Sequence, residues 1–214
     1  MLSKRLCIAL TTAGLLAATG TAAMASPAHR AHATHSVAAQ AATTAFTNGS
    51  FETPTAPPNS FSTFFTGQNM GLWHVEGGSV DLVDDGYWQA AEGSQSVDLN
   101  GGNAGVLSQT FRTEPGTKYT VTYSLAGNPD GGPAVKRGNV RIDGQDFQDF
   151  TFDVSGKTRT NMGYVTRQFT FVANRTSTKL TFASTISGAH GPVIDDVKVK
   201  CCHSCQSCNS SSCN

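Results

Sequence analysis

Apolar and polar residues alternate along much of the chain from residue 80 onward, and each alternating row predicts one β-strand. Residues two apart lie on the same face of a strand, so a row with one apolar face indicates a half-buried strand. The rows are Val80 and Leu82; Val97 and Leu99; Tyr119, Val121, Tyr123 and Leu125; Val140 and Ile142; Phe150, Phe152 and Val154; Phe169 and Phe171; Leu180 and Phe182; and Val197 and Val199.

Turn sequences separate these rows. Glycine occurs at Pro115-Gly116, Gly131-Gly132-Pro133, Asp143-Gly144 and Ser155-Gly156, where we expect strands to end. No stretch of about ten residues in this region has the periodicity of a helix. About nine short antiparallel strands with one apolar face each require two sheets packed together. The sequence therefore predicts an all-β fold, an antiparallel β-sandwich of the jelly-roll type, with a closed barrel as the alternative.

Residues 1–25 have the features of a secretory signal peptide. Lys4 and Arg5 precede an apolar run, Leu6–Ala18, and Ala23-Met24-Ala25 is a small-x-small cleavage pattern. The apolar run is shorter than the roughly 18 residues of a transmembrane helix, and no later segment reaches that length. We therefore expect a secreted protein without a transmembrane segment.

The rest of the chain divides into three parts. Residues 26–45 are small and polar, which predicts a flexible linker. Residues 46–200 hold all the alternating rows and no cysteine, so we expect one β-sandwich domain that folds without disulfides. Residues 201–214 form a cysteine-rich tail. The 15 basic and 15 acidic residues of the whole chain are scattered, so the sequence lacks the basic stripe of a nucleic-acid-binding protein.

Several sequence segments, in a fixed order, resemble a known family. They are "NGSFE" at residues 48–52, "WHVEGGSVDLV" at 73–83, "YWQAAEGSQSVDLNG" at 87–101, "LAGNPDGGP" at 125–133, "NMGY" at 161–164 and "GPVIDDVKV" at 191–199. Together they resemble the choice-of-anchor C family of secreted bacterial proteins, which is similar to a plant cell-wall family with domain of unknown function 642. The resemblance implies a galactose-binding-like jelly roll, an extracellular location, and association with polysaccharide or cell wall.

A candidate sugar-binding site lies in two of these segments. A sugar ring has an apolar face that stacks on aromatic rings, and its hydroxyls donate to carboxylates and amides. "VDDGYWQ" combines both kinds of group, and the "GNPDGGP" segment adds an amide and a carboxylate. The predicted ligand residues are Asp84, Asp85, Tyr87, Trp88, Asn128 and Asp130. In the alternative, Trp88 fills one end of the sandwich, as we expect Trp73 to do.

The resemblance also implies a structural calcium ion between the first and last strands. Asp195 is expected on the inward face of the last strand with Val197 and Val199, where a carboxylate is costly unless it is paired or bound to metal. Glu52 near the other end of the domain offers a second oxygen ligand. In the alternative, Asp195 pairs with an arginine or caps backbone N–H groups.

The tail predicts a disulfide-linked appendage. Its cysteines are Cys201, Cys202, Cys205, Cys208 and Cys213. Thiols pair in the oxidising environment outside the cell, and the odd number leaves one for a covalent link to another molecule or a second copy. In the alternative, the spacing of Cys202, Cys205 and Cys208, together with His203, holds zinc or a soft metal.

The sequence favours binding over catalysis. Glycosidases need two carboxylates that face each other across a cleft, whereas neighbours such as Asp84 and Asp85 point to opposite faces of a strand. We therefore predict a secreted, non-catalytic carbohydrate-binding module that associates with cell-wall or extracellular polysaccharide. The alternatives are a structural or adhesive surface protein with a protein partner and, third, a carbohydrate-active enzyme.

Overall fold

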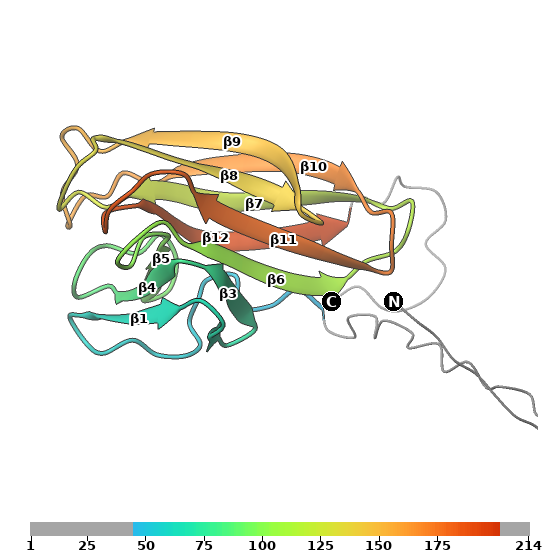
Figure 1. The fold of residues 1–214 in the computed structure, drawn as a ribbon, viewed down its shortest axis with the longest axis horizontal. Helices are drawn as coiled ribbons and strands as arrows, with labels where there is room; N and C mark the ends of the chain where they lie inside the picture. Colours follow the sequence, from blue (N-terminus) through green and yellow to red (C-terminus); the bar gives the residue numbers. More distant parts are fainter. Residues whose placement is uncertain (1–44, 202–214) are drawn as a thin grey trace, which may run out of the picture. The chain divides into compact units, whose positions relative to one another are not determined.

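The computed structural model describes residues 45–201, which form two antiparallel six-stranded sheets packed face to face (Figure 1). Sheet A has the strand order β1 (Phe61–Phe65), β4 (Ser79–Asp84), β5 (Gln95–Asp98), β12 (Pro192–Cys201), β7 (Lys118–Gly127) and β10 (Val165–Val172). Sheet B has the order β2 (Asn69–Met70), β3 (Trp73–Gly77), β6 (Val106–Arg112), β11 (Ser177–Ser184), β8 (Val135–Ile142) and β9 (Gln145–Asp153). This architecture confirms the predicted jelly-roll β-sandwich.

The core lies between the two sheets and is built from the alternating rows of the sequence. Across sheet A, Leu82, Val97 and Ile194 lie side by side on neighbouring strands. Across sheet B, Leu107, Phe182 and Val140 do the same. All of these side chains are fully buried in one hydrophobic cluster. Each buried apolar side chain contributes on the order of 1.5–3 kcal/mol, so these rows are the main source of the domain's stability.

Residues 45–201 form twelve strands rather than about nine. Strand β6 was not predicted from alternation, because a polar residue, Gln109, occupies a core-face position between Leu107 and Phe111. The buried amide of Gln109 keeps its hydrogen bonds, because it both donates to and accepts from the backbone of Thr47. Strand β2 has only two residues, which is too short for any periodicity.

A β-bulge in β12 places Asp195 on the opposite face of the strand from the one expected. The register with β7 shifts between Asp195 and Lys198, and the bulged residue Asp196 has a positive φ of 49°. Asp195 therefore pairs with Ser124, whereas Val199 pairs with Val121 on the opposite face. The prediction that Asp195 shares a face with Val199 is wrong because one extra residue inverts the alternation.

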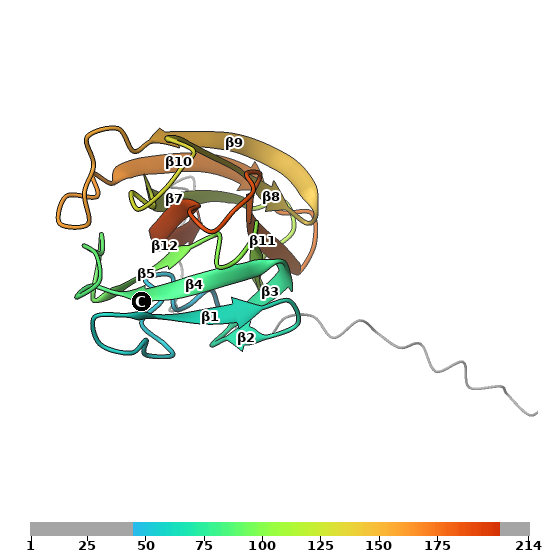
Figure 2. The ribbon, with the colours of Figure 1, turned by 60° about the vertical axis from the view of Figure 1, so that its left-hand side comes forward.

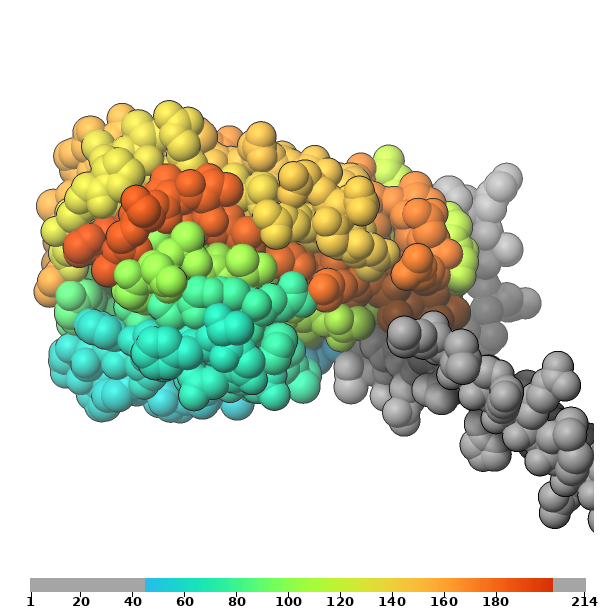
Figure 3. Space-filling model, in the orientation of Figure 1, coloured from blue at the N-terminus to red at the C-terminus, as the bar shows by residue number. Residues whose placement is uncertain are grey.

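The face of sheet A opposite to Leu82 is covered by loops at its β1 edge. Figure 2 shows β1 and β4 side by side at this edge. In the space-filling view, the cyan N-terminal strands border the green segment that follows them in the sequence (Figure 3). Within residues 45–201, no helix is long and apolar enough to cross a membrane.

Candidate ligand-binding pocket

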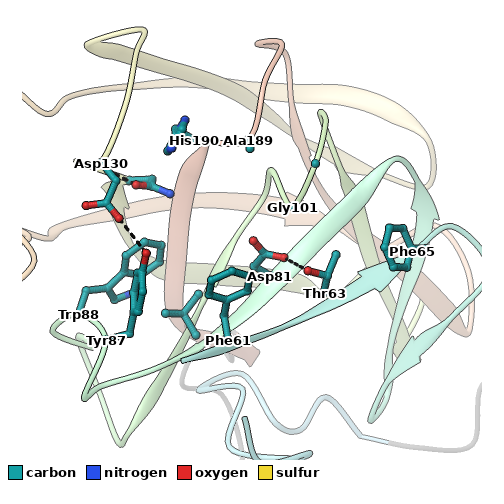
Figure 4. A pocket seen from close by; sticks show the side chains of 13 residues that line it. Phe61, Thr63, Phe65, Asp81, Tyr87, Trp88, Gly101, Asp130, Ala189 and His190 are labelled. Atoms are coloured by element: carbon teal, nitrogen blue, oxygen red, sulfur yellow. Dashed lines mark hydrogen bonds between the residues drawn. The ribbon is translucent and has the colours of Figure 1, made fainter. Parts of the chain in front are cut away.

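A pocket of about 300 Å³ opens on this loop-covered face of sheet A (Figure 4). Its floor comes from β1 and β4, where Phe61, Thr63 and Phe65 lie opposite Val83, Asp81 and Ser79 on one face. One wall comes from the loop that holds Tyr87 and Trp88. The rim comes from segments around residues 101, 130 and 190, so the pocket joins segments that are far apart in the sequence.

Asp81 places a buried carboxyl group on the floor of the pocket. Its side chain is 9% exposed, and its Oδ1 atom accepts a hydrogen bond of 2.6 Å from Thr63 Oγ1. Burial raises the pKa of Asp81 above its ordinary value, and the bond from Thr63 only partly offsets that effect. Sequence reasoning missed this residue because, on alternation alone, Asp81 is expected in solvent on the face opposite to Val80 and Leu82.

Asp98 lies directly opposite Asp81 on β5 but is sealed away from the pocket. It accepts three hydrogen bonds, from the backbone N–H groups of Asn100 (2.8 Å) and Gly191 (2.9 Å) and from Asn128 Nδ2 (2.7 Å). Burial raises the pKa of Asp98 to about 8 even though these donors favour the ionised form. Asp98 therefore ties two rim segments to the sheet and has no contact left for a ligand.

Tyr87, Asp130 and Arg159 form a connected cluster beside the pocket. Arg159 donates to Asp130 through Nε (2.8 Å) and Nη2 (2.8 Å), and the guanidinium lowers the pKa of the Asp130 carboxyl. Tyr87 Oη donates to Asp130 and accepts from Arg159 Nη2. The Arg159 guanidinium carbon also lies 4.0 Å from the centre of the Tyr87 ring. One face of Tyr87 is therefore covered and cannot stack on a ligand.

Trp88 is a core residue rather than an exposed platform. It is 3% exposed, and its indole N–H donates to Ser96 Oγ at 2.8 Å. The burial of Trp88 favours the alternative in which it fills the sandwich, and Trp73 is buried as well. The most exposed aromatic side chains at the pocket are Phe61 and Phe65, which are 42% and 57% exposed, whereas Tyr87 is half-buried. The alternation in "FSTFF" is the signal that could have identified them.

The six predicted ligand residues divide into two groups. Tyr87, Trp88, Asn128 and Asp130 all line the pocket. Asp84 does not, because its Oδ1 atom accepts backbone N–H groups from Asn59 (2.7 Å) and Gly86 (2.9 Å) and so shapes its own loop. Asp85 is exposed and lines a neighbouring hollow with Arg159. His190 and Arg159 carry no sequence motif that would have indicated a site.

Lys136 holds two rim segments together from below. Its side chain is fully buried, and Nζ donates to the carbonyl oxygens of Gly131 (2.7 Å) and His190 (2.8 Å). Burial lowers the pKa of the ammonium group, and the nearby Asp98 opposes that effect. Because Lys136 comes from sheet B, it links the pocket rim to the second sheet.

The sequence comparisons identify the family. A family model described as "Protein of unknown function (DUF642)" matches residues 44–200. The chain belongs to the DUF642 family. This result confirms the resemblance to the plant family, whereas the choice-of-anchor C resemblance stays a prediction.

Two curated relatives share part of their length with this DUF642 chain. Halomucin of Haloquadratum walsbyi is 31% identical over 159 residues, which is 71% of this chain and 2% of halomucin. Protein DUF642 L-galactono-1,4-lactone-responsive gene 1 of Arabidopsis thaliana is 29% identical over 178 residues, which is 72% of this chain and 44% of that protein. The chain therefore spans less than half the length of either relative.

Solved structures with a similar fold include domains described as carbohydrate-binding modules. TmCBM61 in complex with β-1,4-galactotriose has a TM-score of 0.46 at 15% identity over 74% of this chain and 98% of that one. The CBM22-1 xylan-binding domain from Paenibacillus barcinonensis Xyn10C has a TM-score of 0.44 at 15% identity over 69% and 97%. A family 35 carbohydrate binding module from Clostridium thermocellum has a TM-score of 0.41 at 15% identity over 64% and 97%.

Glu52 and Asp195, the predicted calcium ligands, both hold the loop at residues 91–95 of the DUF642 domain. Asp195 Oδ2 accepts the N–H groups of Ala91 (2.8 Å) and Glu92 (2.9 Å), and burial raises its pKa to about 7. Glu52 Oε1 accepts those of Ser94 (2.9 Å) and Gln95 (3.1 Å). Among residues 45–201, no three His, Cys, Asp or Glu side chains gather as a metal site. These contacts favour the capping alternative, and calcium stays a prediction.

Cys201 is the only tail cysteine within the described residues. It is the last residue of β12, it is exposed, and it pairs with Tyr119 of β7. Cys202, Cys205, Cys208 and Cys213 lie outside the described residues. Their disulfide or metal chemistry stays a prediction, as do the signal peptide and the linker.

Proposed function

We propose that this DUF642 domain is a non-catalytic carbohydrate-binding module and that the pocket on sheet A holds the sugar. The observation that carries the proposal is the combination of two exposed phenylalanines on β1 with a buried carboxyl group on the floor between them. A sugar ring requires both an apolar surface and hydrogen-bond acceptors, and few other neutral polar molecules do.

The geometry of β1 suits stacking. Phe61, Thr63 and Phe65 project from the same face at successive alternate positions, so the two rings flank the Thr63–Asp81 hydrogen bond. A sugar that covers a phenylalanine ring would bring its hydroxyls toward Asp81 and toward Asn128 and His190 at the rim. Asp81 would accept hydroxyl hydrogens through the oxygen that Thr63 leaves open.

The carboxyl groups of the pocket support binding rather than hydrolysis. A glycosidase needs an acid and a second, available carboxylate. Asp81 and Asp130 both line the pocket, but Asp130 is engaged by Arg159 and Tyr87. Asp98, the neighbour of Asp81, is fully bonded to N–H donors. The pocket thus offers one carboxyl group that is open to a ligand.

The proposed partner is a polysaccharide of a cell wall or extracellular matrix. The signal-peptide pattern of residues 1–25 supports a location outside the cell. The cysteine tail would then provide a covalent attachment point.

Co-sedimentation of the full chain with a panel of insoluble polysaccharides tests the proposal. We expect retention on at least one polymer and loss of at least 90% of it, a tenfold effect of about 1.4 kcal/mol, in the double variant Phe61→Ala, Phe65→Ala. Phe147→Ala is the matched control, because Phe147 is also an exposed phenylalanine but lies on β9 of sheet B. Equal retention of both variants would place the site elsewhere, and no retention on any polymer would overturn the proposal.

A protein partner is the second candidate, and the position of β1 favours it. β1 is an edge strand of sheet A, so among the strands of residues 45–201 it has no neighbour on one side of its backbone. An edge strand with exposed phenylalanines can accept a strand from another protein. In that case the double variant would lose a protein partner in a pull-down while polysaccharide retention stays absent.

A further inference from the structure

We infer that the pocket selects a sugar that carries a protonated amine, and that Asp81 forms the ion pair with the ligand's ammonium group. The inference rests on the proposed function, because it specifies the class of sugar that the same pocket prefers. The charge balance of the pocket, an acid on the floor and no lysine or arginine among the described lining residues, carries the inference.

Asp81 is a buried acid that has no cationic partner in the part of the chain that the structure describes. Within residues 45–201, the one hydrogen bond to its carboxyl group comes from the neutral hydroxyl of Thr63. That bond uses Oδ1, and Figure 4 shows the carboxyl group on the floor of the pocket between Phe61 and Thr63. A buried carboxylate is costly unless an opposite charge and hydrogen-bond donors accompany it. Oδ2 is therefore an acceptor that a ligand can satisfy.

The other charges near the pocket do not supply that cation. Arg159 is committed to Asp130 and Tyr87. Lys136 donates to two backbone carbonyls below the rim. Among the described residues that line the pocket there is no lysine or arginine, and His190 is the one basic side chain, on the rim. The pocket therefore keeps an acidic floor for its ligand.

An ammonium group fits this floor better than a hydroxyl does. An ammonium brings a full positive charge and three N–H donors, whereas a sugar hydroxyl brings one donor and no charge. The exposed rings of Phe61 and Phe65 also attract a cation that lies over their faces, in addition to stacking on C–H groups. An N-acetylated amine has lost the charge, so acetylation would remove the advantage.

Titration calorimetry of the full chain at neutral pH with matched sugars tests the inference. The probes are glucosamine, N-acetylglucosamine and glucose, together with galactosamine, N-acetylgalactosamine and galactose, so that two ring configurations are compared. We expect one free amine to bind at least tenfold more tightly than its acetylated and neutral counterparts. Asp81→Asn keeps the shape and the Thr63 bond, and we expect it to abolish that preference, so that the ratio of amine affinity to neutral-sugar affinity falls to about one.

Asp149→Asn is the control for net charge, because Asp149 is exposed on β9 of sheet B. It should leave the preference for the amine unchanged. Equal affinity for the amine and the neutral sugar, or a preference that survives Asp81→Asn, would overturn this inference but leave sugar binding intact. If none of the six sugars and no polysaccharide binds, the proposed function fails and the inference fails with it.

Discussion

Asp81 and Asp98 lie directly opposite each other on β4 and β5, yet only Asp81 opens into the pocket. The difference comes from the loops above the sheet, because Asn128 and Gly191 cover Asp98 with N–H donors and leave Asp81 with Thr63 alone. Two adjacent acids therefore have different roles: Asp98 positions the rim, and Asp81 forms the floor.

Because Asp98 and Asp195 are buried acids with raised pKa values, we expect the free energy of unfolding to fall as the pH rises from about 4 to about 8. The folded-state pKa of Asp98 is raised to about 8 and that of Asp195 to about 7, so the folded chain holds protons that the unfolded chain has released. The free energy of unfolding should fall by at most about 1.4 kcal/mol per pH unit for each acid. Urea unfolding between pH 4.5 and 8 measures this slope.

The variant Asp195→Asn isolates one of the two acids, since an amide does not titrate. Its slope should be shallower than that of the wild type between pH 4.5 and 7. Acids with lowered pKa, such as Asp130, lose protons below this range and do not mask the effect. A flat or rising stability in the wild type would contradict the prediction.

Lys136→Met should weaken both the fold and ligand binding. Methionine is of similar length but has no N–H donor, so the carbonyls of Gly131 and His190 lose their partner. We expect a loss of about 1–3 kcal/mol in the free energy of unfolding and weaker sugar binding, because the rim segments are no longer held together. Chemical unfolding and calorimetry measure the two effects.

Lys179→Met is the matched control for that experiment. Lys179 forms a partly exposed ion pair with Glu76 on sheet B, away from the pocket. Its loss should change the free energy of unfolding by less than about 1 kcal/mol. If both variants behave alike, the pocket rim does not depend on Lys136.

The sequence predicted the sandwich because local alternation determines it. Rows such as Tyr119 to Leu125 require only that residues two apart share a face. The bulge at Asp196 was not predictable, because one extra residue in a strand changes no composition but inverts every side chain after it.

The pocket was predicted only in part, because its lining depends on which loops meet. The segment at residues 84–88 and Asn128 and Asp130 could be proposed from their chemistry, and four of these residues do line it. The floor of the pocket at Asp81 could not be predicted, since the loops that cover this residue lie far away in the sequence. Trp88 is the opposite case. Its residue type is suited to sugar binding, but its side chain packs in the core and donates a hydrogen bond to Ser96.

Trp88 and Phe65 should separate stability from binding. Trp88→Ala removes a 3%-exposed side chain and should cost about 3–5 kcal/mol in the free energy of unfolding. Phe65→Ala removes a 57%-exposed side chain and should cost less than about 1 kcal/mol but weaken sugar binding severalfold. Thermal unfolding and calorimetry on both variants give the comparison, and a binding defect in Trp88→Phe at full stability would restore Trp88 as a ligand residue.

Glu52 should act on the loop at residues 91–95 through hydrogen bonds. A methyl group at Gly93, which has a φ of 63°, would collide with Glu52 Oε1, so the carboxyl group lies tight against the loop backbone. Glu52→Gln keeps an oxygen that can accept the Ser94 and Gln95 N–H groups, whereas Glu52→Ala does not. We expect Glu52→Gln to melt close to the wild type and Glu52→Ala to lose about 1–2 kcal/mol in the free energy of unfolding, with or without a calcium chelator.

A bound calcium ion would give a different pattern: chelation would lower the melting temperature of the wild type, and Glu52→Gln would already show that loss. Melting curves of the three proteins in calcium and in chelator therefore distinguish backbone capping from metal binding at this end of the sandwich.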